Sequence, residues 1–217
     1  ITTLTNNGTI SGTATGTGYG IRLILGGNIT TLTNNGTISA TATNDTARGI
    51  SVTTSTITNL TNDGTISGSA GNNSGNGISF LAASTLTNLT NDGTITATAG
   101  NNNGQGILLN GNSTIGTLTN NSTISGTADN NNGHGIVAFA TSTITNLTNT
   151  GTISGTAGND DGYGIYLTSS STITTLTNDG TISGTAGNDS GQGIRVRSST
   201  LTTLTNNGTI SSTTVGD

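Results

Sequence analysis

The chain has 217 residues, of which 6% are charged and 28% are hydrophobic, whereas an ordinary globular domain is about 25% charged and about 45–50% apolar. Its formal net charge is −5 at pH 7, which excludes the basic surface that a nucleic-acid-binding protein needs. The 52 threonines favour β-strands over disorder, because disordered chains are usually rich in charge and poor in β-branched residues.

The chain also lacks cysteine and long apolar segments. Without cysteine it can form neither a disulfide nor a thiolate metal site. Its longest apolar run, residues 21–25, contains Arg22 and is far shorter than the ~20 residues of a membrane-spanning helix. We therefore expect that residues 1–217 do not insert into a membrane. Because the chain begins at Ile1, on a repeat boundary, we also expect it to be part of a longer protein.

From its first residue the chain is a tandem repeat. Each repeat contains a strand-like run such as residues 57–62 (ITNLTN), an Asn/Asp-Gly turn, and a second run such as residues 64–70 (GTISGSA). A polar loop, residues 71–76 in this repeat, precedes a third run at 77–80 (GISF), and a Ser/Thr-rich link follows. Successive repeats are 28 or 29 residues long and begin at Ile1, Ile29, Ile57, Leu86, Ile115, Ile144, Ile173 and Leu201.

Three strands in every repeat predict a coil rather than a meander of hairpins. A meander would place all the strands in one open sheet, and such sheets rarely exceed ~10 strands. A coil instead pairs each strand in parallel with its copy one repeat away. The sequence therefore predicts a single all-β domain over residues 1–217. Its fold is a parallel β-helix (β-solenoid) with three short strands per ~29-residue coil, seven full coils and a partial one.

Side-chain alternation along the strands predicts which residues face the core. Ile57 and Leu60 both have core character but are an odd number of residues apart, so we expect a bend between them. In this repeat the predicted inward positions are Leu60, Asn62, Ile66, Ala70, Ile78 and Phe80.

One inward position carries asparagine in every repeat. A buried amide is costly unless its donors and acceptor are satisfied. At a coil spacing of ~4.8 Å, each amide can bond to its copy in the next coil and to the turn backbone. We therefore predict a structural asparagine ladder formed by Asn6, Asn34, Asn62, Asn91, Asn120, Asn149, Asn178 and Asn206.

These repeats resemble the β-helical passenger domains of bacterial autotransporters and related type V secreted adhesins. The resemblance rests on the motif L-T-N-x-G-T-I-S-G followed by G-I-x-L, for instance at residues 147–155 and 164–167. It implies a right-handed β-helix, export across the outer membrane, and display or release at the bacterial cell surface. Enzymes of that family carry an additional catalytic domain or loop, and this sequence contains neither.

Candidate catalytic and metal-binding residues are few, and we expect no enzyme activity, cofactor or metal. Asp63 and Asp92 occupy equivalent turn positions, but other repeats have Asn or Thr there, which indicates interchange of turn residues. Asp160 and Asp161 could bind Ca²⁺ weakly, yet the nonapeptide calcium repeat is absent. His134 has no acid or nucleophile at a matching spacing, so we expect a surface loop residue.

Two small clusters lie near the C-terminal end of the chain. Arg195 and Arg197 are predicted to point outward and to form a mildly basic spot on an acidic rod. Tyr163 and Tyr166 could stack on a sugar ring, but two aromatic residues alone do not predict a groove.

The second strand of each repeat carries outward hydroxyl groups at alternate positions. With ~6.7 Å between them along a strand and ~4.8 Å between coils, they would form a flat lattice similar to the faces of ice-binding β-solenoids. Thr and Ser are also ordinary outward β-strand residues. The candidate hydroxyl face comprises Thr9, Ser11, Thr13, Thr37, Ser39, Thr41, Thr65, Ser67, Thr94, Thr96, Thr98, Thr123, Ser125, Thr127, Thr152, Ser154, Thr156, Thr181, Ser183 and Thr185.

Together these features predict a non-enzymatic, extracellular structural or adhesive solenoid at a bacterial cell surface. It would act as a stalk, an adhesive surface or a fibre. The expected partners are other copies of the chain, stacked end to end or laterally, or glycans and proteins of cell surfaces. A self-assembling filament and an ice-binding protein are the two alternatives.

Overall fold

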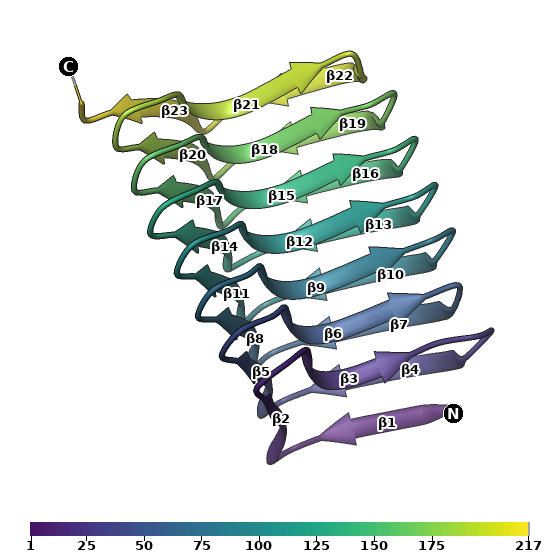
Figure 1. The fold of residues 1–217 in the computed structure, drawn as a ribbon. Coiled ribbons are helices and arrows are strands. Elements are labelled where there is room, and N and C mark those ends of the chain that lie inside the picture. Colours follow the sequence, from purple (N-terminus) through teal and green to yellow (C-terminus); the bar gives the residue numbers. More distant parts are fainter. Residues whose placement is uncertain (217) are drawn as a thin grey trace.

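The computed structural model describes residues 1–216, which form one stack of β-strand coils (Figure 1). The strands pair into three parallel sheets, here named A, B and C, that run the length of the stack. This arrangement confirms the predicted parallel β-solenoid with three strands per coil. The described residues form no helix, and they therefore contain no helix that is long and apolar enough to cross a membrane.

Each sheet contains one strand from every full coil, and the partial last coil adds one strand to sheet A and one to sheet B. Sheet A consists of β1 (Thr3–Asn6), β4 (Asn28–Asn34), β7 (Thr56–Asn62), β10 (Thr85–Asn91), β13 (Thr114–Asn120), β16 (Thr143–Asn149), β19 (Thr172–Asn178) and β22 (Thr200–Asn206). Sheet B consists of β2 (Thr9–Ala14), β5 (Thr37–Ala42), β8 (Thr65–Ala70), β11 (Thr94–Ala99), β14 (Thr123–Ala128), β17 (Thr152–Ala157), β20 (Thr181–Ala186) and β23 (Thr209–Thr214). Sheet C consists of β3 (Gly18–Leu23), β6 (Ala47–Thr53), β9 (Gly75–Leu81), β12 (Gly104–Asn110), β15 (Gly133–Phe139), β18 (Gly162–Thr168) and β21 (Gly191–Arg197).

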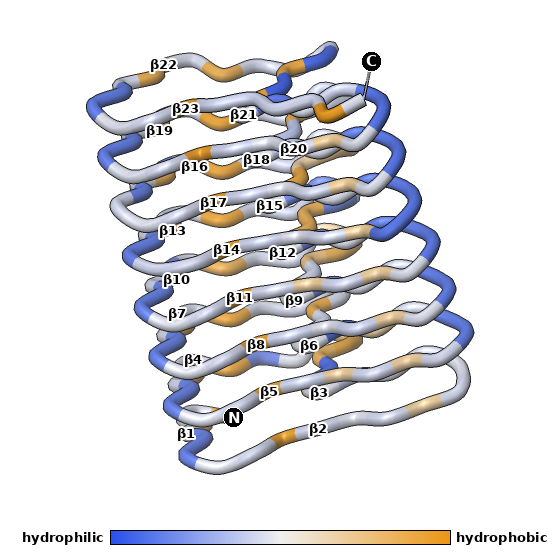
Figure 2. The backbone as a smooth tube through the Cα atoms, turned by 90° about the vertical axis from the view of Figure 1, so that its left-hand side faces the viewer, coloured by the Kyte–Doolittle hydropathy of each residue, from blue (hydrophilic) through white to orange (hydrophobic). Residues whose placement is uncertain are grey.

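The strands pair like with like, so the core is built of columns of equivalent residues. Leu89 of β10, for example, pairs with Leu60 of β7 on one side and with Leu118 of β13 on the other. The predicted inward positions of the third coil are all confirmed: Leu60, Asn62, Ile66, Ala70, Ile78 and Phe80 are buried. Figure 2 shows apolar positions recurring at the same place in successive coils, with hydrophilic turns at both edges.

The bend predicted between Ile57 and Leu60 is present in sheet A. Between β7 and β10 the pairing register runs from the Ile57–Leu86 pair to the Asn59–Asn88 pair and omits the intervening residue. The two core side chains on either side of this break are therefore both directed inward.

Sheets B and C touch at the polar loop that joins them. A Cβ atom added to Gly68 of β8 would lie 2.1 Å from the carbonyl oxygen of Asn76 in β9. The neighbouring coils have alanine at the equivalent position, Ala40 and Ala97, and such small residues allow the two backbones to come into contact. The sheets diverge from there to enclose the apolar core beside sheet A. Small residues such as Ala42 and Ala47 form a separate cluster near this loop, whereas the large apolar side chains make up the main core.

The corner between sheets C and A has an unusual backbone and a second buried ladder. Several of its residues have positive φ, including Thr54 at 50°, Ala83 at 59° and Thr141 at 62°. Immediately after this turn, a serine side chain accepts a hydrogen bond from the backbone N–H of its counterpart in the preceding coil. One example is the 3.2 Å bond from the N–H of Ser84 to Oγ of Ser113. The serine ladder comprises Ser55, Ser84, Ser113, Ser142, Ser171 and Ser199.

Candidate functional site

The chemically distinctive side chains of the chain lie on one surface, the outer face of sheet C. The sequence contains four arginines, three tyrosines, two glutamines and one histidine, and all of them occupy outward positions of sheet C strands. We call this surface the sheet C face. Equivalent residues of successive coils form two main columns on it. The first column consists of Tyr19, Arg48, Asn76, Gln105, His134, Tyr163 and Gln192. The second column consists of Arg22, Ser51, Ser79, Leu108, Val137, Tyr166 and Arg195.

The sheet C face is concave because each of its strands bends at a glycine. In β9 the pairing register with β12 skips Gly77. A Cβ atom added to Gly77 would lie 2.6 Å from the carbonyl oxygen of Gly106 and 2.8 Å from Cγ2 of Ile95, so glycine alone fits without a shift of its neighbours. The bend draws outward side chains into a corner. Asn76 and Ser79 are therefore only 1% and 0% exposed, although both point away from the core.

A hollow of about 230 Å³ lies in this corner, between the second and fifth coils. It combines polar side chains with the apolar surfaces of Leu108 and Phe139, a mixture typical of small-molecule sites in proteins. Among the residues that line it are Arg48, Asn76, Gln105, Leu108, Asn110 and Phe139.

Three buried side-chain polar atoms of residues 1–216 have no hydrogen-bond partner, and all three belong to the first column of this face. They are Nε of Arg48, Oδ1 of Asn76 and Nδ1 of His134. Leaving such an atom without a partner costs about 1–3 kcal/mol, so native proteins retain few of them. All three atoms therefore leave hydrogen-bonding capacity unused on one surface, the sheet C face.

An aromatic cluster continues the hollow along the stack. The rings of His134 and Tyr163 are stacked, with centroids 5.0 Å apart and an angle of 2° between their planes. Tyr166 is tilted against both, at 5.5 Å from His134 and 5.2 Å from Tyr163. The guanidinium of Arg195 lies 5.0 Å from the centre of the Tyr163 ring and donates a hydrogen bond to its hydroxyl oxygen. Arg22 and Arg48 flank Tyr19 similarly at the other end, at 4.7 and 5.8 Å.

These contacts correct two predictions from the sequence. His134 is not a surface loop residue: it lies within β15 and is 4% exposed. Tyr163 and Tyr166 are not an isolated pair, because His134 and Arg195 complete a continuous cluster with them. The glycine bend in sheet C explains both differences, since it converts outward positions into the wall of a concave surface.

Burial sets the protonation states within this cluster. Desolvation lowers the pKa of His134 from 6.5 to about 4, so its imidazole is neutral at pH 7. Burial, together with the nearby Asp161 carboxylate, raises the pKa of the Tyr163 phenol well above 10. The central part of the sheet C face, from Asn76 to Val137, therefore carries no charge at pH 7, and the arginines lie toward its two ends.

The asparagine column forms the predicted ladder in the core. Nδ2 of each asparagine donates to Oδ1 of its counterpart in the next coil, as in the 2.8 Å bond from Asn62 to Asn91. The same nitrogen reaches turn carbonyl groups, such as those of Gly64 and Thr94, at 3.2 Å. All seven links from Asn6 to Asn206 are present. The ladder supports the scaffold and has no access to a ligand.

The candidate hydroxyl face occupies the outer side of sheet B. Equivalent hydroxyl residues stand in register from coil to coil, such as Thr94 with Thr65 and Thr123. Some hydroxyls bond to one another, including Thr96 with Ser125 at 3.1 Å. This surface is thus a regular array of half-exposed hydroxyl groups, separate from the sheet C face.

The turn aspartates make structural hydrogen bonds. Oδ1 of Asp92 accepts a 2.7 Å bond from Nδ2 of Asn121 in the next coil, and Oδ1 of Asp179 accepts a 2.8 Å bond from Nδ2 of Asn207. These pairs agree with the interchange of Asn and Asp at the turn. Among residues 1–216, no three His, Cys, Asp or Glu side chains cluster as ligands for a metal ion.

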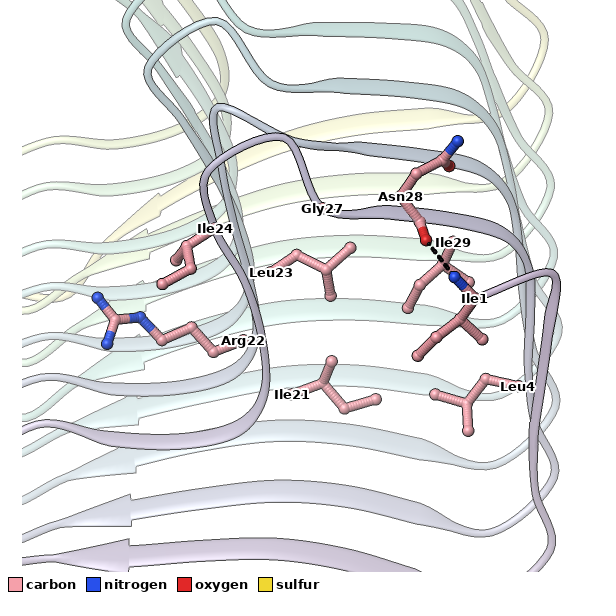
Figure 3. Close-up of a pocket in the computed structure, with 9 residues that line it drawn as sticks. All are labelled: Ile1, Leu4, Ile21, Arg22, Leu23, Ile24, Gly27, Asn28 and Ile29. Carbon is pink, nitrogen blue, oxygen red and sulfur yellow. Dashed lines mark hydrogen bonds between the residues drawn. The ribbon is translucent and has the colours of Figure 1, made fainter.

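A second hollow, of about 370 Å³, lies at the first coil (Figure 3). Ile21, Leu23 and Ile29 line it, while Arg22 points away. Leu23 and Ile29 belong to the apolar core, so this hollow is the end of the core at the first coil. It lacks the convergent polar groups of the sheet C face.

Models of protein families, curated proteins and solved structures were each compared with the chain, and none of them matches it.

Proposed function

We propose that the chain is an extracellular, non-enzymatic adhesive solenoid whose repeated coils form a rigid scaffold and whose sheet C face binds a partner. One observation carries this proposal: the Arg, Tyr, His and Gln residues of the chain are confined to that face. The outward positions of the other two sheets carry chiefly Thr, Ser and Asn. Side chains that vary from coil to coil on a constant scaffold are typical of repeat proteins that bind through one surface.

The scaffold part of the proposal is supported by the two buried ladders and the continuous sheets. Successive full coils are joined by three parallel pairings and by the Asn ladder, and from the second coil on also by the Ser ladder. Such a stack resists bending and would hold a binding surface away from its attachment point. The resemblance of the repeats to autotransporter passenger domains supports an extracellular, bacterial cell-surface location. Possible partners are surface glycans, proteins or further copies of the chain.

A surface-binding assay tests the adhesive function. The labelled chain is incubated with bacterial, plant and animal cells, and the bound fraction is measured against concentration. We expect saturable binding that is lost when Arg48 and Tyr166 on the sheet C face are replaced by Ser. The matched control replaces Asn59 and Asn146, on the outer side of sheet A, by Ser and retains binding. Equal binding by both variants would exclude the sheet C face, and no saturable binding to any cell would contradict adhesion.

Electron microscopy of the material as its source produces it tests the scaffold role. Rods of one length that are attached to a cell surface are the result expected for a displayed adhesin. Open-ended filaments would instead support the alternative of a self-assembling fibre, in which the coils themselves are the material.

Ice binding is a second candidate, favoured by the in-register hydroxyl residues of sheet B. The test measures inhibition of ice recrystallisation by the chain and by a Thr123→Tyr variant. An ice-binding function requires strong inhibition by the parent chain and its loss in the variant at an unchanged unfolding midpoint. No inhibition by the parent chain excludes this candidate.

A further inference from the structure

We propose that the sheet C face binds a neutral polysaccharide chain that lies along the long axis of the stack, across the second to sixth coils. This inference rests on the proposed adhesive function and specifies its ligand. It rests on three observations. Three buried polar atoms have no hydrogen-bond partner, the central coils of this face carry no charge, and the sheet C strands are paired on both sides.

The orphaned atoms require a ligand that both donates and accepts hydrogen bonds. Nε of Arg48 can only donate, whereas Oδ1 of Asn76 can only accept. His134, as a neutral imidazole, has one donor and one acceptor nitrogen. A carboxylate, sulfate or phosphate group has acceptors alone and would leave the Asn76 oxygen unsatisfied. A hydroxyl group satisfies both kinds of atom, and a polysaccharide carries hydroxyl groups along its whole length.

The positions of these atoms favour a linear ligand over a compact one. Arg48, Asn76 and His134 belong to the second, third and fifth coils, and Gln105 occupies the same column in the fourth. Successive coils of a parallel stack are ~4.8 Å apart, so these groups recur along a straight line parallel to the axis. A small molecule confined to the hollow would not reach His134, which is not among the residues that line it.

The apolar surfaces of the groove fit a sugar ring as well. Leu108 and Val137 occupy the column beside the polar groups, and the half-buried Tyr166 continues that column in the sixth coil. The half-buried ring of Phe139 belongs to the next outward column. Sugar rings combine apolar C–H faces with polar hydroxyl edges, so they can pack against these surfaces while bonding to the polar column. Sites of this mixed kind, with a few placed polar groups among apolar ones, are typical of ligand pockets.

The same geometry disfavours an extended peptide. Peptides that bind to sheets usually add a strand to an unpaired edge. The strands under this groove are paired on both sides, as β12 is with β9 and β15. Their backbone groups are therefore inaccessible, and recognition depends on side chains alone.

The test measures binding of the full 217-residue chain to oligosaccharides of graded length. The probes are linear neutral glucans, mannans and galactans, with polygalacturonate and heparin as acidic comparators. We expect at least one neutral series to bind, with an affinity that rises with length until the ligand spans the groove. The acidic polymers should bind more weakly, and added salt should change the affinity of the neutral ligand little.

Two groove variants and one matched control locate the site. Asn76→Leu and Gln105→Leu remove the amide groups but keep side chains of similar size, and each should lower the affinity about tenfold or more. Asn88→Leu makes the same change at an exposed amide of sheet A and should leave affinity unchanged. Unfolding midpoints of all three variants establish that they are folded.

The outcomes separate this inference from the adhesive function. If neutral oligosaccharides bind but the groove variants bind equally well, the sheet C face is not the site. If only acidic polymers bind, or if no polysaccharide binds while the chain still adheres to cells, the ligand class is wrong and adhesion stands. If the chain neither adheres to cells nor binds a polysaccharide, both proposals fail.

Discussion

Nδ2 of Asn91 donates a 2.8 Å hydrogen bond to Oδ1 of Asn120, and Nδ2 of Asn120 in turn donates a 2.7 Å bond to Oδ1 of Asn149. All three side chains are 0% exposed. Each amide thus satisfies its neighbour, and no link can be replaced without leaving a buried group unpaired on either side. The ladder explains why one polar residue recurs in the core of every coil.

The Asn120→Ala variant should be destabilised by about 2–3 kcal/mol, because it leaves the Asn149 oxygen and two turn carbonyl groups without their donor. The free energy of unfolding, measured with chemical denaturant, checks this. The control is Asn88→Ala, which removes an exposed amide from a coil-to-coil pair on sheet A and should change stability by less than about 0.5 kcal/mol. Equal losses in the two variants would show that the buried ladder has no special role.

The glycine at the bend of sheet C should resist substitution. A Cβ atom on Gly106 would lie 2.6 Å from the carbonyl oxygen of Gly135 and 2.9 Å from Cγ2 of Ile124. Gly106→Ala should therefore cost about 1–3 kcal/mol through overpacking. Gly16→Ala is the control, because nothing lies within 4 Å of the Cβ atom that alanine would add there. Thermal unfolding of both variants provides the measurement, and a Gly106→Ala variant as stable as the parent would contradict the close approach.

The fold could be derived from the sequence because its determinants are local and repeated. The period-two pattern around Ile66 identifies the core face of a strand, and the odd spacing of Ile57 and Leu60 requires the bend that the structure contains. Asn62 could be assigned to a ladder because only a stack of identical coils satisfies a buried amide in every repeat. Each of these features depends only on residues within one coil and on their equivalents in the adjacent coils.

The sheet C face could not be derived in the same way. His134 follows a run of Asn and Gly residues, and from its position alone it resembles a loop residue. Its burial depends on the bend of sheet C at Gly135, which side-chain alternation does not reveal. One sequence signal was available: alignment of the repeats places Tyr19, Arg48 and Tyr163 with His134 in one variable slot. The serine ladder had a similar signal, a Ser-Thr pair such as Ser84-Thr85 at the same place in successive coils.

The corner between sheets C and A offers a site for stabilisation. Thr54 has φ of 50°, a left-handed conformation that costs a β-branched residue about 1–2 kcal/mol. Two other coils place Gly26 and Gly111 at this corner. Thr54→Gly should therefore raise stability by about 0.5–1 kcal/mol after the greater entropy of glycine in the unfolded chain is deducted. Thr87→Gly, at an exposed strand position, should instead lower stability, and thermal unfolding of the two variants decides between the outcomes.

The stability of the chain should fall in mild acid because of His134. Its folded-state pKa of about 4 lies below the ordinary 6.5, so between these values the unfolded chain takes up a proton that the folded chain does not. Full stability is present above pH 6.5, declines as the pH falls toward 4, and loses about 3 kcal/mol over that range. Tyr163, Tyr166, Asp161 and Arg195 surround the imidazole, and none of them provides a charge strong enough to reverse the effect of burial.

The His134→Gln variant isolates that contribution, because Gln105 and Gln192 occupy the same column in other coils. Unfolding free energies at a series of pH values from 7 down to about 4 should decline less steeply for the variant than for the parent chain. Identical profiles would show that His134 is not the group responsible.

The unpaired amide of Asn76 should lower the stability of the chain when no ligand is bound. Its side chain is 1% exposed and its Oδ1 has no partner, which carries a penalty of about 1–3 kcal/mol. Asn76→Leu removes the polar atoms and keeps the size, so without ligand the variant should be more stable than the parent by about 1 kcal/mol. Asn91→Leu, the same change in the satisfied ladder, should have the opposite sign. Denaturant unfolding of both variants measures the difference. A destabilised Asn76→Leu variant would mean that the amide serves the fold, whereas a more stable one would indicate that a buried polar group is retained for binding at the expense of stability.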